Sequence, residues 1–428
     1  MRLSRFGEKL TTESGILALM DDLGKALAGD RKKYMLGGGN PAHIPQMNAL
    51  WRDRMQRILD TPGAFERMLS NYDPPQGNPA FIEALARLLN RRLGWPVEPG
   101  NIAVTNGSQT SFFLLFNMLG GTRSDGSHGR ILFPMMPEYI GYADQAIDPA
   151  VFTAHRPVIE ELDRHTFKYH VDLQAIAVDA DIAALCVSRP TNPTGNVLTD
   201  EELTYLDAIA RQAEVPLIID NAYGVPFPGM IFEPATPLWN ENIIVAMSLS
   251  KLGLPATRTG IIIAASEVIN AVTACNAVLS LANGSIGQTV VTPLLESGEI
   301  LRASEQIIRP YYQRKSQQAI GWIREAFSSD IDYRVHRCEG SLFLWVWFRN
   351  LPVSTLELYR RLKRRNTIVV PGRYFFFGLD QPWEHQDQCI RLNYAMDDSD
   401  VRMGIGLIAD EVRRVQAERV GEDRNSTL

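Results

Sequence analysis

The sequence is poor in the residues that build disulfide frameworks and metal sites. It has only four cysteines among 428 residues, and no two of them form a C-x-x-C pair. Its seven histidines show no H-E-x-x-H or comparable ligand spacing. These features argue against a disulfide scaffold and against a zinc site, so we expect no bound metal and a reducing, cytoplasmic setting.

Long apolar runs and an excess of positive charge are missing as well. No uninterrupted apolar stretch approaches the ~18 residues that a transmembrane helix needs, and residues 1–10 lack the apolar core of a signal peptide. Lys plus Arg number 43 and Asp plus Glu number 49, which gives a net charge of −6. This balance gives no reason to expect a nucleic acid or an anionic membrane as a partner.

The middle of the chain alternates short apolar runs with helical patterns, which is typical of a mostly parallel sheet covered by helices. The runs predicted as strands are 101–106, 130–136, Ile182–Ser188, 216–220, Ile243–Ser248 and 259–264. Helices are predicted at 111–119 and Asp200–Gln212. The second helix is preceded by Thr199, and Glu202 follows three residues later, a spacing that predicts a capping box.

The last third of the chain changes character. A long amphipathic stretch at about 304–327 is followed by apolar runs at 341–348, 367–370 and 389–394 and by helical patterns at 355–365 and 401–418. We interpret the three apolar runs as the sheet of a second, smaller α+β domain. The predicted parts are an N-terminal segment, 1–60, that contributes to the small domain, a large cofactor-binding domain, 61–300, and a C-terminal small domain, 301–428.

The segment from Ser248 to Arg258 carries the most specific chemistry. A lone lysine after a buried strand is normally a surface residue. Here two hydroxyls, Ser248 and Ser250, bracket Lys251, and Arg258 follows on the same loop. Hydroxyls and an arginine fork suit a phosphate dianion. A lysine beside a phosphate ester predicts a phosphate-bearing aldehyde cofactor that the lysine holds as an imine.

That hypothesis requires further groups, and the sequence offers candidates for each. Asp220 ends an apolar run and could pair with a pyridinium nitrogen, although a turn or helix cap is the plainer interpretation. Tyr223 and Asn192 could bond a phenolic oxygen of the cofactor, or be a packed aromatic and a simple turn. Tyr139 could stack on the cofactor ring, or be an ordinary core or surface aromatic.

The phosphate also needs backbone donors. Gly107, Ser108 and Gln109 lie between a predicted strand and an apolar helix. Gly107 lets the backbone come close to an anion, and the free amides at the helix start face it. Because strand–Gly–helix junctions occur in many unrelated proteins, this motif is only moderately specific.

Taken in order, these motifs resemble the fold type I aminotransferases of class I and II, which use pyridoxal 5′-phosphate. The resemblance covers about residues 35 to 395. It rests on Tyr72…Gly77, Asn106-Gly107-Ser108, Pro137-x-Tyr139, Asn192-Pro193-Thr194-Gly195, Asp220-x-x-Tyr223, Ser248-x-Ser250-Lys251, Arg258-x-Gly260 and Arg391. It implies an α/β fold with a large domain, whose mostly parallel central sheet is flanked by helices, and a smaller α+β domain. One departure is Ala256, where many relatives carry glycine; the methyl is tolerable if φ is negative.

The resemblance implies a role for each motif residue at the cofactor. Lys251 would hold the cofactor and shuttle a proton, Asp220 would pair with the ring nitrogen, and Asn192 and Tyr223 would bond the phenolic oxygen. The other residues expected to contact the cofactor are Gly107, Ser108, Gln109, Ser248, Ser250 and Arg258 around the phosphate, and Tyr139 on the ring.

The same resemblance extends to the substrate and to a partner subunit. Arg391 would clamp the substrate carboxylate, with the Gly39 backbone and Asn192 nearby. Tyr72 would reach the phosphate of the neighbouring subunit, so a homodimer with shared active sites is expected.

Within the family, several segments are most similar to the enzymes that exchange amino groups between valine, alanine or 2-aminobutyrate and their 2-oxo acids. Those segments are Leu36-Gly37-Gly38-Gly39-Asn40-Pro41, Asn71-Tyr72-Asp73, 137–144, Lys168-Tyr169-His170-Val171-Asp172 and 220–228. No second carboxylate-binding arginine can be placed, which favours an aliphatic monocarboxylic amino acid. The implied reaction is ping-pong, with pyruvate or 2-oxoisovalerate as the acceptor.

Two other functions stay open at this point. A lyase or an oxidising decarboxylase on the same scaffold would use the same Lys251, Asp220 and Arg391, so the sequence barely separates it from an aminotransferase. A regulator with a degenerate enzyme domain would carry an N-terminal DNA-binding module, whereas only about 35 residues precede the first motif here. The intact lysine, aspartate and arginine also argue against a regulator.

Overall fold

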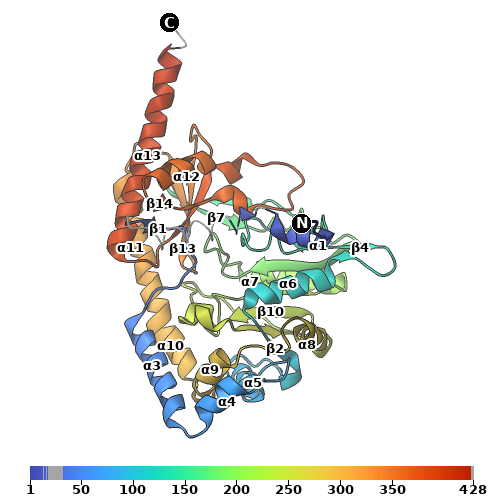
Figure 1. Cartoon of the computed structure of the whole chain (residues 1–428). Coiled ribbons are helices and arrows are strands. Elements are labelled where there is room, and N and C mark those ends of the chain that lie inside the picture. The colour runs from blue at the N-terminus through green and yellow to red at the C-terminus, as the bar shows by residue number, and fades with distance from the viewer. Residues whose placement is uncertain (13, 16, 18–31, 426–428) are drawn as a thin grey trace.

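The chain folds around two sheets joined by a long helical segment, as the computed structural model shows (Figure 1). The structure describes residues 1–12, 14, 15, 17 and 32–425, with side chains to residue 418. The larger sheet and its helices fill the lower part of Figure 1, and the second sheet lies above them. In the described part of the chain, no helix is long and apolar enough to cross a membrane.

The larger sheet has eight strands, in the order β2-β11-β10-β9-β8-β4-β3 with β5 beside β4. Strands β10, β9, β8, β4 and β5 are parallel neighbours, and β11 runs antiparallel to both of its neighbours. The strands are β2 (Ile102–Thr105), β3 (Gly121–Thr122), β4 (His128–Phe133), β5 (Phe152–Ala154), β8 (Ile182–Ser188), β9 (Leu217–Asp220), β10 (Ile243–Ser248) and β11 (Gly260–Ile263). The predicted mostly parallel sheet is therefore confirmed.

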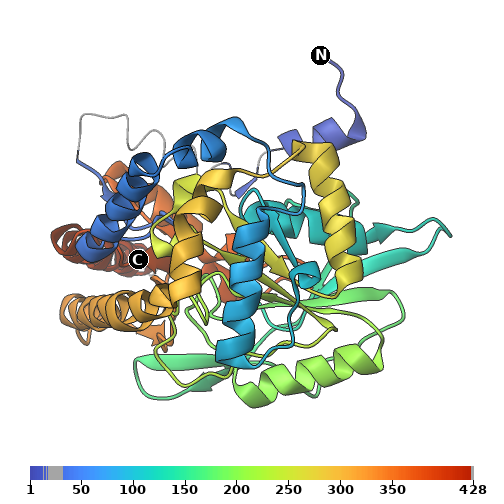
Figure 2. The same ribbon diagram turned by 90° about the horizontal axis from the view of Figure 1, so that it is seen from below.

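Helices surround this sheet (Figure 2). They are α5 (Pro79–Leu93), α6 (Ser108–Leu119), α7 (Asp200–Gln212), α8 (Ser266–Ser280) and α9 (Ser285–Ser297). The predicted capping box of α7 is present, because Thr199 Oγ1 accepts from the Glu202 amide at 3.1 Å and Glu202 Oε2 accepts from the Thr199 amide at 2.7 Å. Helix α6 begins at Ser108, three residues before the predicted start, since Gly107 turns the chain with φ +84°.

The second sheet is larger than predicted. It has six strands, in the order β15-β16-β13-β12-β7-β6, where the sequence indicated three. The strands are β6 (Val158–Glu161), β7 (Thr166–His170), β12 (Tyr333–His336), β13 (Phe343–Phe348), β15 (Val370–Pro371) and β16 (Cys389–Asn393). The β6–β7 hairpin lies between residues 61 and 300 in sequence but extends this sheet, because β7 pairs in parallel with β12. The division into domains at residues 60 and 300 stays a prediction.

The predicted strand 367–370 divides in two. Its first half is β14 (Thr367–Ile368), which pairs with β1 (Tyr34–Met35) in a separate two-stranded sheet, and its second half begins the edge strand β15. The N-terminal part of the chain therefore contacts the C-terminal part directly. Helices α12 (Thr355–Arg364) and α13 (Asp398–Asn425) agree with the predicted helical patterns, although α13 extends further at both ends.

A long helical segment connects the two sheets. It consists of α10 (Glu299–Ala303), a wider π-type turn (Ser304–Ile308) and α11 (Arg309–Phe327). The predicted stretch, 304–327, is its C-terminal part. Helix α3 (Pro45–Asp60) is followed along the chain by α4 (Ala64–Ser70). A short helix, α1 (Arg5–Thr11), lies near the N-terminus. The four cysteines are free, and the cytoplasmic setting stays a prediction.

Candidate active site

The predicted site residues gather where the parallel strands end. The register places Ser188, Asp220 and Ala246 side by side on β8, β9 and β10. Ser248, at the end of β10, pairs with Gly260, which in turn pairs with Thr105 at the end of β2. In open α/β sheets this carboxyl edge is where ligands bind. Motifs far apart in the sequence thus meet at one edge.

Lys251 projects from a short 3-10 turn, η2 (Ser250–Leu252), directly after β10. Its Nζ donates to the Gly39 carbonyl at 2.7 Å and lies 5.3 Å from the centre of the Tyr223 ring. The turn is held by Trp51, whose indole Nε1 donates to the Leu252 carbonyl at 3.0 Å. The lysine amine therefore lies at the carboxyl edge of the larger sheet, between the Gly39 backbone and the Tyr223 ring.

The charge state of this amine is perturbed. The pKa of Lys251 is lowered to about 8, chiefly by burial and next by the positive charge of Arg391, while Asp220 acts in the opposite direction. The neutral fraction of the amine near physiological pH is thus much larger than for an ordinary lysine, although the protonated form still predominates. Only a neutral amine can attack a carbonyl or remove a proton.

Asp220 is held rigidly at the end of β9. Its Oδ1 accepts from the Ala222 amide at 2.9 Å, and its Oδ2 accepts from the Tyr142 hydroxyl. Burial raises its pKa, and the hydrogen bond from Tyr142 opposes that rise. A buried carboxylate of this kind is suited to hold a cationic partner.

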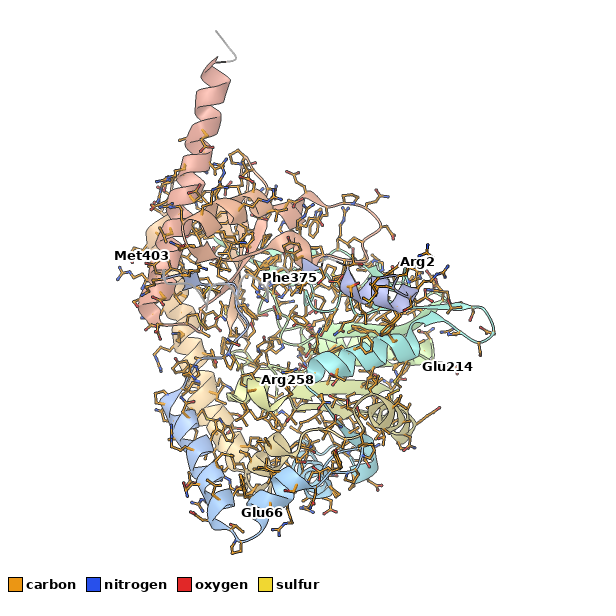
Figure 3. All side chains as sticks on the ribbon, viewed as in Figure 1. Arg2, Glu66, Glu214, Arg258, Phe375 and Met403 are labelled. Atoms are coloured by element: carbon orange, nitrogen blue, oxygen red, sulfur yellow. The ribbon has the colours of Figure 1, made fainter. Side chains whose placement is uncertain are left out.

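An anion cradle lies beside Lys251. Gly107 precedes α6 with φ +84° and ψ 157°, a conformation essentially reserved for glycine. A Cβ at this position would lie 2.1 Å from Arg258 Nη2, so the guanidinium packs directly on the glycine backbone. The first amides of α6, at Ser108 and Gln109, have no acceptor within the helix and can bind an anion. Arg258 itself has φ +48°, and in the view of Figure 3 it lies below Phe375.

Two serines complete the cradle. Ser250 donates its amide to Ser248 Oγ at 3.0 Å, and the two hydroxyls lie 2.9 Å apart. Ala256 lies in η3 (Pro255–Thr257) without a positive φ, so the methyl group is accommodated there. The Gln109 side chain donates to the Gly141 carbonyl at 3.3 Å and so faces the loop that carries Tyr139. The donor set of this cradle fits a phosphate group.

Replacing Gly107 by alanine tests the cradle. The methyl group must displace the Arg258 guanidinium and the backbone must leave its glycine conformation, which costs about 1–3 kcal/mol. We expect the affinity for pyridoxal phosphate, measured by absorbance titration, to fall about 5- to 150-fold. Gly100→Ala is the matched control, since a Cβ there meets nothing within 4 Å. Equal affinity in the two variants would contradict the assignment.

Arg391 comes from the opposite side, on β16. It is 2% exposed, and its guanidinium carbon lies 4.0 Å from the centre of the Phe343 ring. Nη1 donates to Asn192 Oδ1 at 2.8 Å and Nη2 donates to the Gly37 carbonyl at 2.7 Å, while Nε is buried and has no partner among the residues that the structure describes. Burial lowers the pKa of Arg391 to about 10. A buried guanidinium with an unused donor fits a carboxylate ligand.

Two tyrosines lie close to these charges. Tyr139 stands edge-on to Tyr142, with the ring centres 5.2 Å apart, and Tyr223 stands edge-on to Phe343 at 6.2 Å. Burial raises the pKa of both Tyr139 and Tyr223, while Arg391 acts in the opposite direction on each. Both rings are therefore buried and lie close enough to Arg391 for its charge to act on them.

Tyr72 is the predicted residue that the structure leaves apart from this group. Its side chain is 82% exposed, in the segment between α4 and α5. An apolar surface lies beside that segment: Val278 is 86% exposed and Leu281 is 59% exposed. The two regions are tied together by Ser285, whose hydroxyl donates to Asp73 Oδ2 at 2.6 Å.

Some residues of the site escaped the sequence interpretation. Tyr142 bonds Asp220 but was only part of a matching segment, and its spacing from Tyr139 was the available signal. Glu138 is fully enclosed; its Oε1 accepts from the Ser188 amide at 2.8 Å, and burial raises its pKa to about 8. Asn393 Nδ2 donates to the Gly38 carbonyl at 2.6 Å, and no sequence motif indicated it.

A lysine with a perturbed amine, a buried carboxylate and a phosphate cradle define a pyridoxal-phosphate-dependent transferase of fold type I. Comparison with known proteins assigns the chain to one family within this class. The family model for aminotransferase class I and II matches residues 47–408, and the chain belongs to this family. Its members depend on pyridoxal phosphate.

Individual relatives cover almost the whole chain. The chain is 48% identical over 418 residues, which is 98% of its length and 100% of the relative's, to valine–pyruvate aminotransferase of Escherichia coli. It superimposes on the crystal structure of valine–pyruvate aminotransferase from Salmonella typhimurium with a TM-score of 0.87 at 48% identity, covering 94% and 100% of the two chains. A putative amino-acid aminotransferase from Psychrobacter arcticum gives a TM-score of 0.94 at 43% identity, covering 97% and 99%.

Proposed function

We propose that this enzyme transfers the amino group of valine to pyruvate, giving 2-oxoisovalerate and alanine, and that it accepts 2-aminobutyrate as well. The observation that carries the proposal is that the Lys251 amine, 2.7 Å from the Gly39 carbonyl, lies close enough to the buried guanidinium of Arg391 for that charge to lower its pKa. The near-complete coverage of valine–pyruvate aminotransferase at 48% identity supports the substrate pair.

The proposed roles follow from the chemistry of each group. When bound, the cofactor supplies an aldehyde that takes up the amino group and a cationic ring that withdraws electrons. The Lys251 amine would hold the cofactor and then move a proton at the substrate Cα, for which a pKa of about 8 is well matched. Asp220 would place its negative charge against the ring nitrogen, and Tyr223 and Asn192 would donate to the phenolic oxygen.

The cradle residues and Tyr139 would make the remaining contacts with the cofactor, to its phosphate and its ring. Gly107, Ser108, Gln109, Ser248, Ser250 and Arg258 would bind the phosphate, and Tyr139 would cover the ring. Because the first half-reaction would leave the amino group on the cofactor and the second would pass it to the acceptor 2-oxo acid, the kinetics would be ping-pong.

The charges around Lys251 support a monocarboxylic substrate. The two arginines that act on its pKa are Arg391 and Arg258. Arg258 packs on Gly107 in the cradle, so Arg391 remains for the substrate carboxylate. The rings of Phe343 and Phe375, 4.0 and 5.1 Å from its guanidinium carbon, would favour an aliphatic side chain nearby.

We also propose that the active unit is a homodimer. The exposed Tyr72 and the apolar Val278, Leu279 and Leu281 form one surface beside the cradle, since Asn106 Nδ2 donates to Ser280 Oγ at 3.0 Å. Apolar side chains exposed this far favour contact with another chain. Tyr72 of one subunit would then reach the phosphate of the other.

The function is tested by incubating the purified enzyme with valine and pyruvate. We expect alanine and 2-oxoisovalerate to form in equal amounts, with parallel lines in double-reciprocal plots at several pyruvate concentrations. Release of carbon dioxide or ammonia from valine without alanine would instead indicate a decarboxylase or a lyase, and would overturn the proposal.

The clamp role of Arg391 is tested by Arg391→Lys. A point charge replaces a planar fork, so the bonds from Nη1 and Nη2 to Asn192 and Gly37 cannot both persist. We expect the KM for valine to rise about 10- to 100-fold with a smaller change in kcat. Arg402→Lys, on the exposed face of α13, is the matched control. An unchanged KM for valine would count against the clamp.

A further inference from the structure

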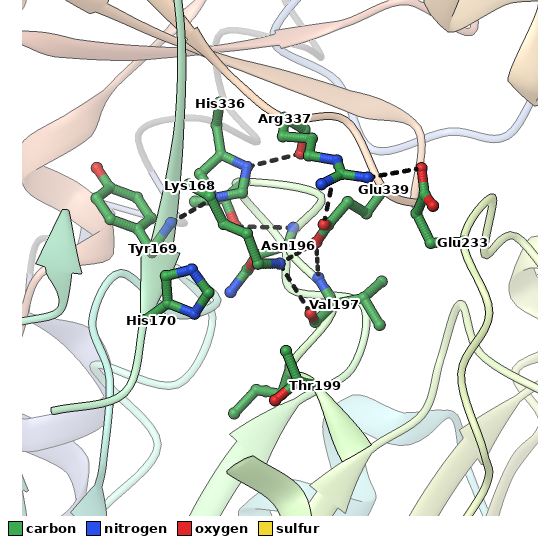
Figure 4. A network of polar contacts seen from close by, with 12 residues as sticks. Lys168, Tyr169, His170, Asn196, Val197, Thr199, Glu233, His336, Arg337 and Glu339 are labelled. Atoms are coloured by element: carbon green, nitrogen blue, oxygen red, sulfur yellow. Dashed lines mark hydrogen bonds and ion pairs between the residues drawn. The ribbon is translucent and has the colours of Figure 1, made fainter. Parts of the chain in front are cut away.

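Lys168 and Glu339 form an ion pair enclosed between the second sheet and the larger sheet (Figure 4). Lys168 lies on β7 and Glu339 lies in the turn between β12 and β13. Their side chains are 5% and 6% exposed. The 168–172 segment marks the closer resemblance in the sequence, and the roles proposed above leave it unexplained.

The lysine uses all three of its donors. Nζ donates to Glu339 Oε2, to Asn196 Oδ1 at 2.9 Å and to the Val197 carbonyl at 3.1 Å. Glu339 Oε2 also accepts from the Val197 amide at 2.9 Å. The pair thus bonds the side chain of Asn196 and both backbone groups of Val197. These two residues end the loop that carries Asn192.

Fixing the end of this loop also fixes its start. The Thr191 amide donates to the Asn196 carbonyl at 2.8 Å, and the Gly195 amide donates back to the Thr191 carbonyl at 2.8 Å. The loop is therefore a closed turn. Asn192, inside the turn, presents Oδ1 to Arg391 Nη1 at 2.8 Å.

The turn that carries Glu339 is itself hydrogen-bonded to the segment that contains Met230 and Phe232. The Phe232 amide donates to the Glu339 carbonyl at 2.8 Å, and the Ser341 amide donates to the Met230 carbonyl at 2.9 Å. A Cβ on Gly340 would meet the Met230 carbonyl oxygen at 2.6 Å, so the two backbones are in direct contact. The pair cannot shift without moving this whole junction.

The other charged and titratable groups around the pair support this arrangement. Burial lowers the pKa of His336 to about 3, so this imidazole stays neutral. Its Nε2 accepts from the Tyr169 amide at 3.0 Å and its Nδ1 donates to the Arg337 carbonyl. Arg337 lies 3.5 Å from Glu339 Oε1 and 3.2 Å from Glu233. Lys168 therefore remains the only one of these groups that both pairs with Glu339 and contacts the loop.

We propose that Lys168 and Glu339 are positioning residues for the substrate clamp: they hold the 191–197 turn so that Asn192 orients the guanidinium of Arg391. The inference rests on the proposed function, because it assumes that Arg391 binds the substrate carboxylate. Buried ion pairs are often no more stabilising than apolar side chains of similar volume. Positioning of the 191–197 turn is therefore a better explanation for this ion pair than a contribution to stability.

The first arm of the test uses cofactor-free protein and hydrogen–deuterium exchange. Lys168→Met removes the donor that holds Asn196 Oδ1 and the Val197 carbonyl, so the acceptors of the Thr191, Gly195 and Val197 amides are no longer held in place. We expect these three amides to exchange at least about tenfold faster. The strand β8 should keep its protection. Glu339→Gln, which keeps the shape of the side chain, should give a smaller increase in the same three amides. Unchanged exchange in both variants would overturn the proposal.

The second arm measures carboxylate recognition in the loaded enzyme. The probe is 3-methylbutanoate, which has the carbon skeleton of valine without its amino group, and binding is followed by cofactor absorbance. We expect its dissociation constant and the KM for valine to rise about tenfold in Lys168→Met, with kcat changed less than about threefold. Arg402→Gln, which breaks an exposed ion pair with Glu325, is the matched control and should match wild type.

The outcomes separate the inference from the proposed function. A role in stability alone would lower the melting temperature of Lys168→Met but leave the 3-methylbutanoate affinity unchanged, and this result would overturn the inference. If the wild-type enzyme does not transaminate valine, the proposed function fails, while faster exchange of the 191–197 amides would still show the coupling. If Lys168→Met does not fold, Glu339→Gln carries both arms.

Discussion

Lys251→Ala is expected to abolish turnover of valine and pyruvate, with kcat reduced by at least about 10⁴-fold. The variant removes the one amine that lies at the carboxyl edge of the sheet with a pKa of about 8. It loses both the group that holds the cofactor and the group that moves a proton at the substrate. Cofactor binding should weaken less, because the cradle of Gly107 and Arg258 is untouched.

The measurement combines steady-state rates with a chemical readout. Borohydride treatment of the wild-type enzyme should fix the cofactor's mass to the peptide that contains Lys251, and treatment of the variant should leave that peptide unlabelled. Lys251→Arg is the matched variant, since arginine keeps the positive charge but stays protonated at any accessible pH. It should be as inactive as Lys251→Ala. Wild-type-like transamination by either variant would refute the role of Lys251.

Much of the larger sheet could be predicted because its strands carry their own signal. β8 (Ile182–Ser188) and β10 (Ile243–Ser248) are buried along their whole length, so a continuous apolar run marks each of them. The start of α7 was predictable for a similarly local reason, the reciprocal bonding of Thr199 and Glu202. Local chemistry of this kind does not depend on the rest of the chain.

The second sheet could not be predicted to the same extent. β6 (Val158–Glu161) is mostly exposed and ends in two glutamates, so its sequence does not read as a strand. β6 forms a strand because it pairs with β7, and β7 in turn pairs with β12. The second pairing joins Thr166 to Val335 and Phe167 to His336, about 170 residues further along the chain. Pairings between distant segments leave little trace in a single sequence.

The same distinction applies to the site. Lys251, Asp220 and Arg258 could be predicted as a set because the chemistry of an aldehyde cofactor requires each of them. The groups that hold the set in place have no such requirement. Tyr142 donates to Asp220, and Lys168 donates to Asn196 in the loop that carries Asn192; only the fold brings these partners close. The sequence predicts the reacting groups better than the groups that position them.

The second large effect is expected at Asp220, which can be changed without changing its shape. Asp220→Asn keeps an oxygen that can accept from the Tyr142 hydroxyl, but it removes the negative charge at the end of β9. Removing one partner of a buried, hydrogen-bonded charge pair costs about 2–5 kcal/mol. A loss of about 4 kcal/mol corresponds to about 10³-fold in rate. Asp220→Ala should lose at least as much.

A second variant separates the effect of the Asp220 charge from the effect of its hydrogen bond to Tyr142. Tyr142→Phe removes the hydroxyl that donates to Asp220 Oδ2 but leaves the carboxylate and its bond from the Ala222 amide. Because that hydrogen bond opposes the rise in the Asp220 pKa caused by burial, its loss should raise this pKa further. As the pH falls, a carboxyl with a higher pKa takes up its proton and loses its charge at a higher pH. The acidic decline of kcat should therefore begin at a higher pH in Tyr142→Phe than in wild type. Asp220→Asn has no carboxyl to titrate and should lack this acidic limb at every pH. A kcat of Asp220→Asn within about tenfold of wild type would show that a charge at this position is not needed.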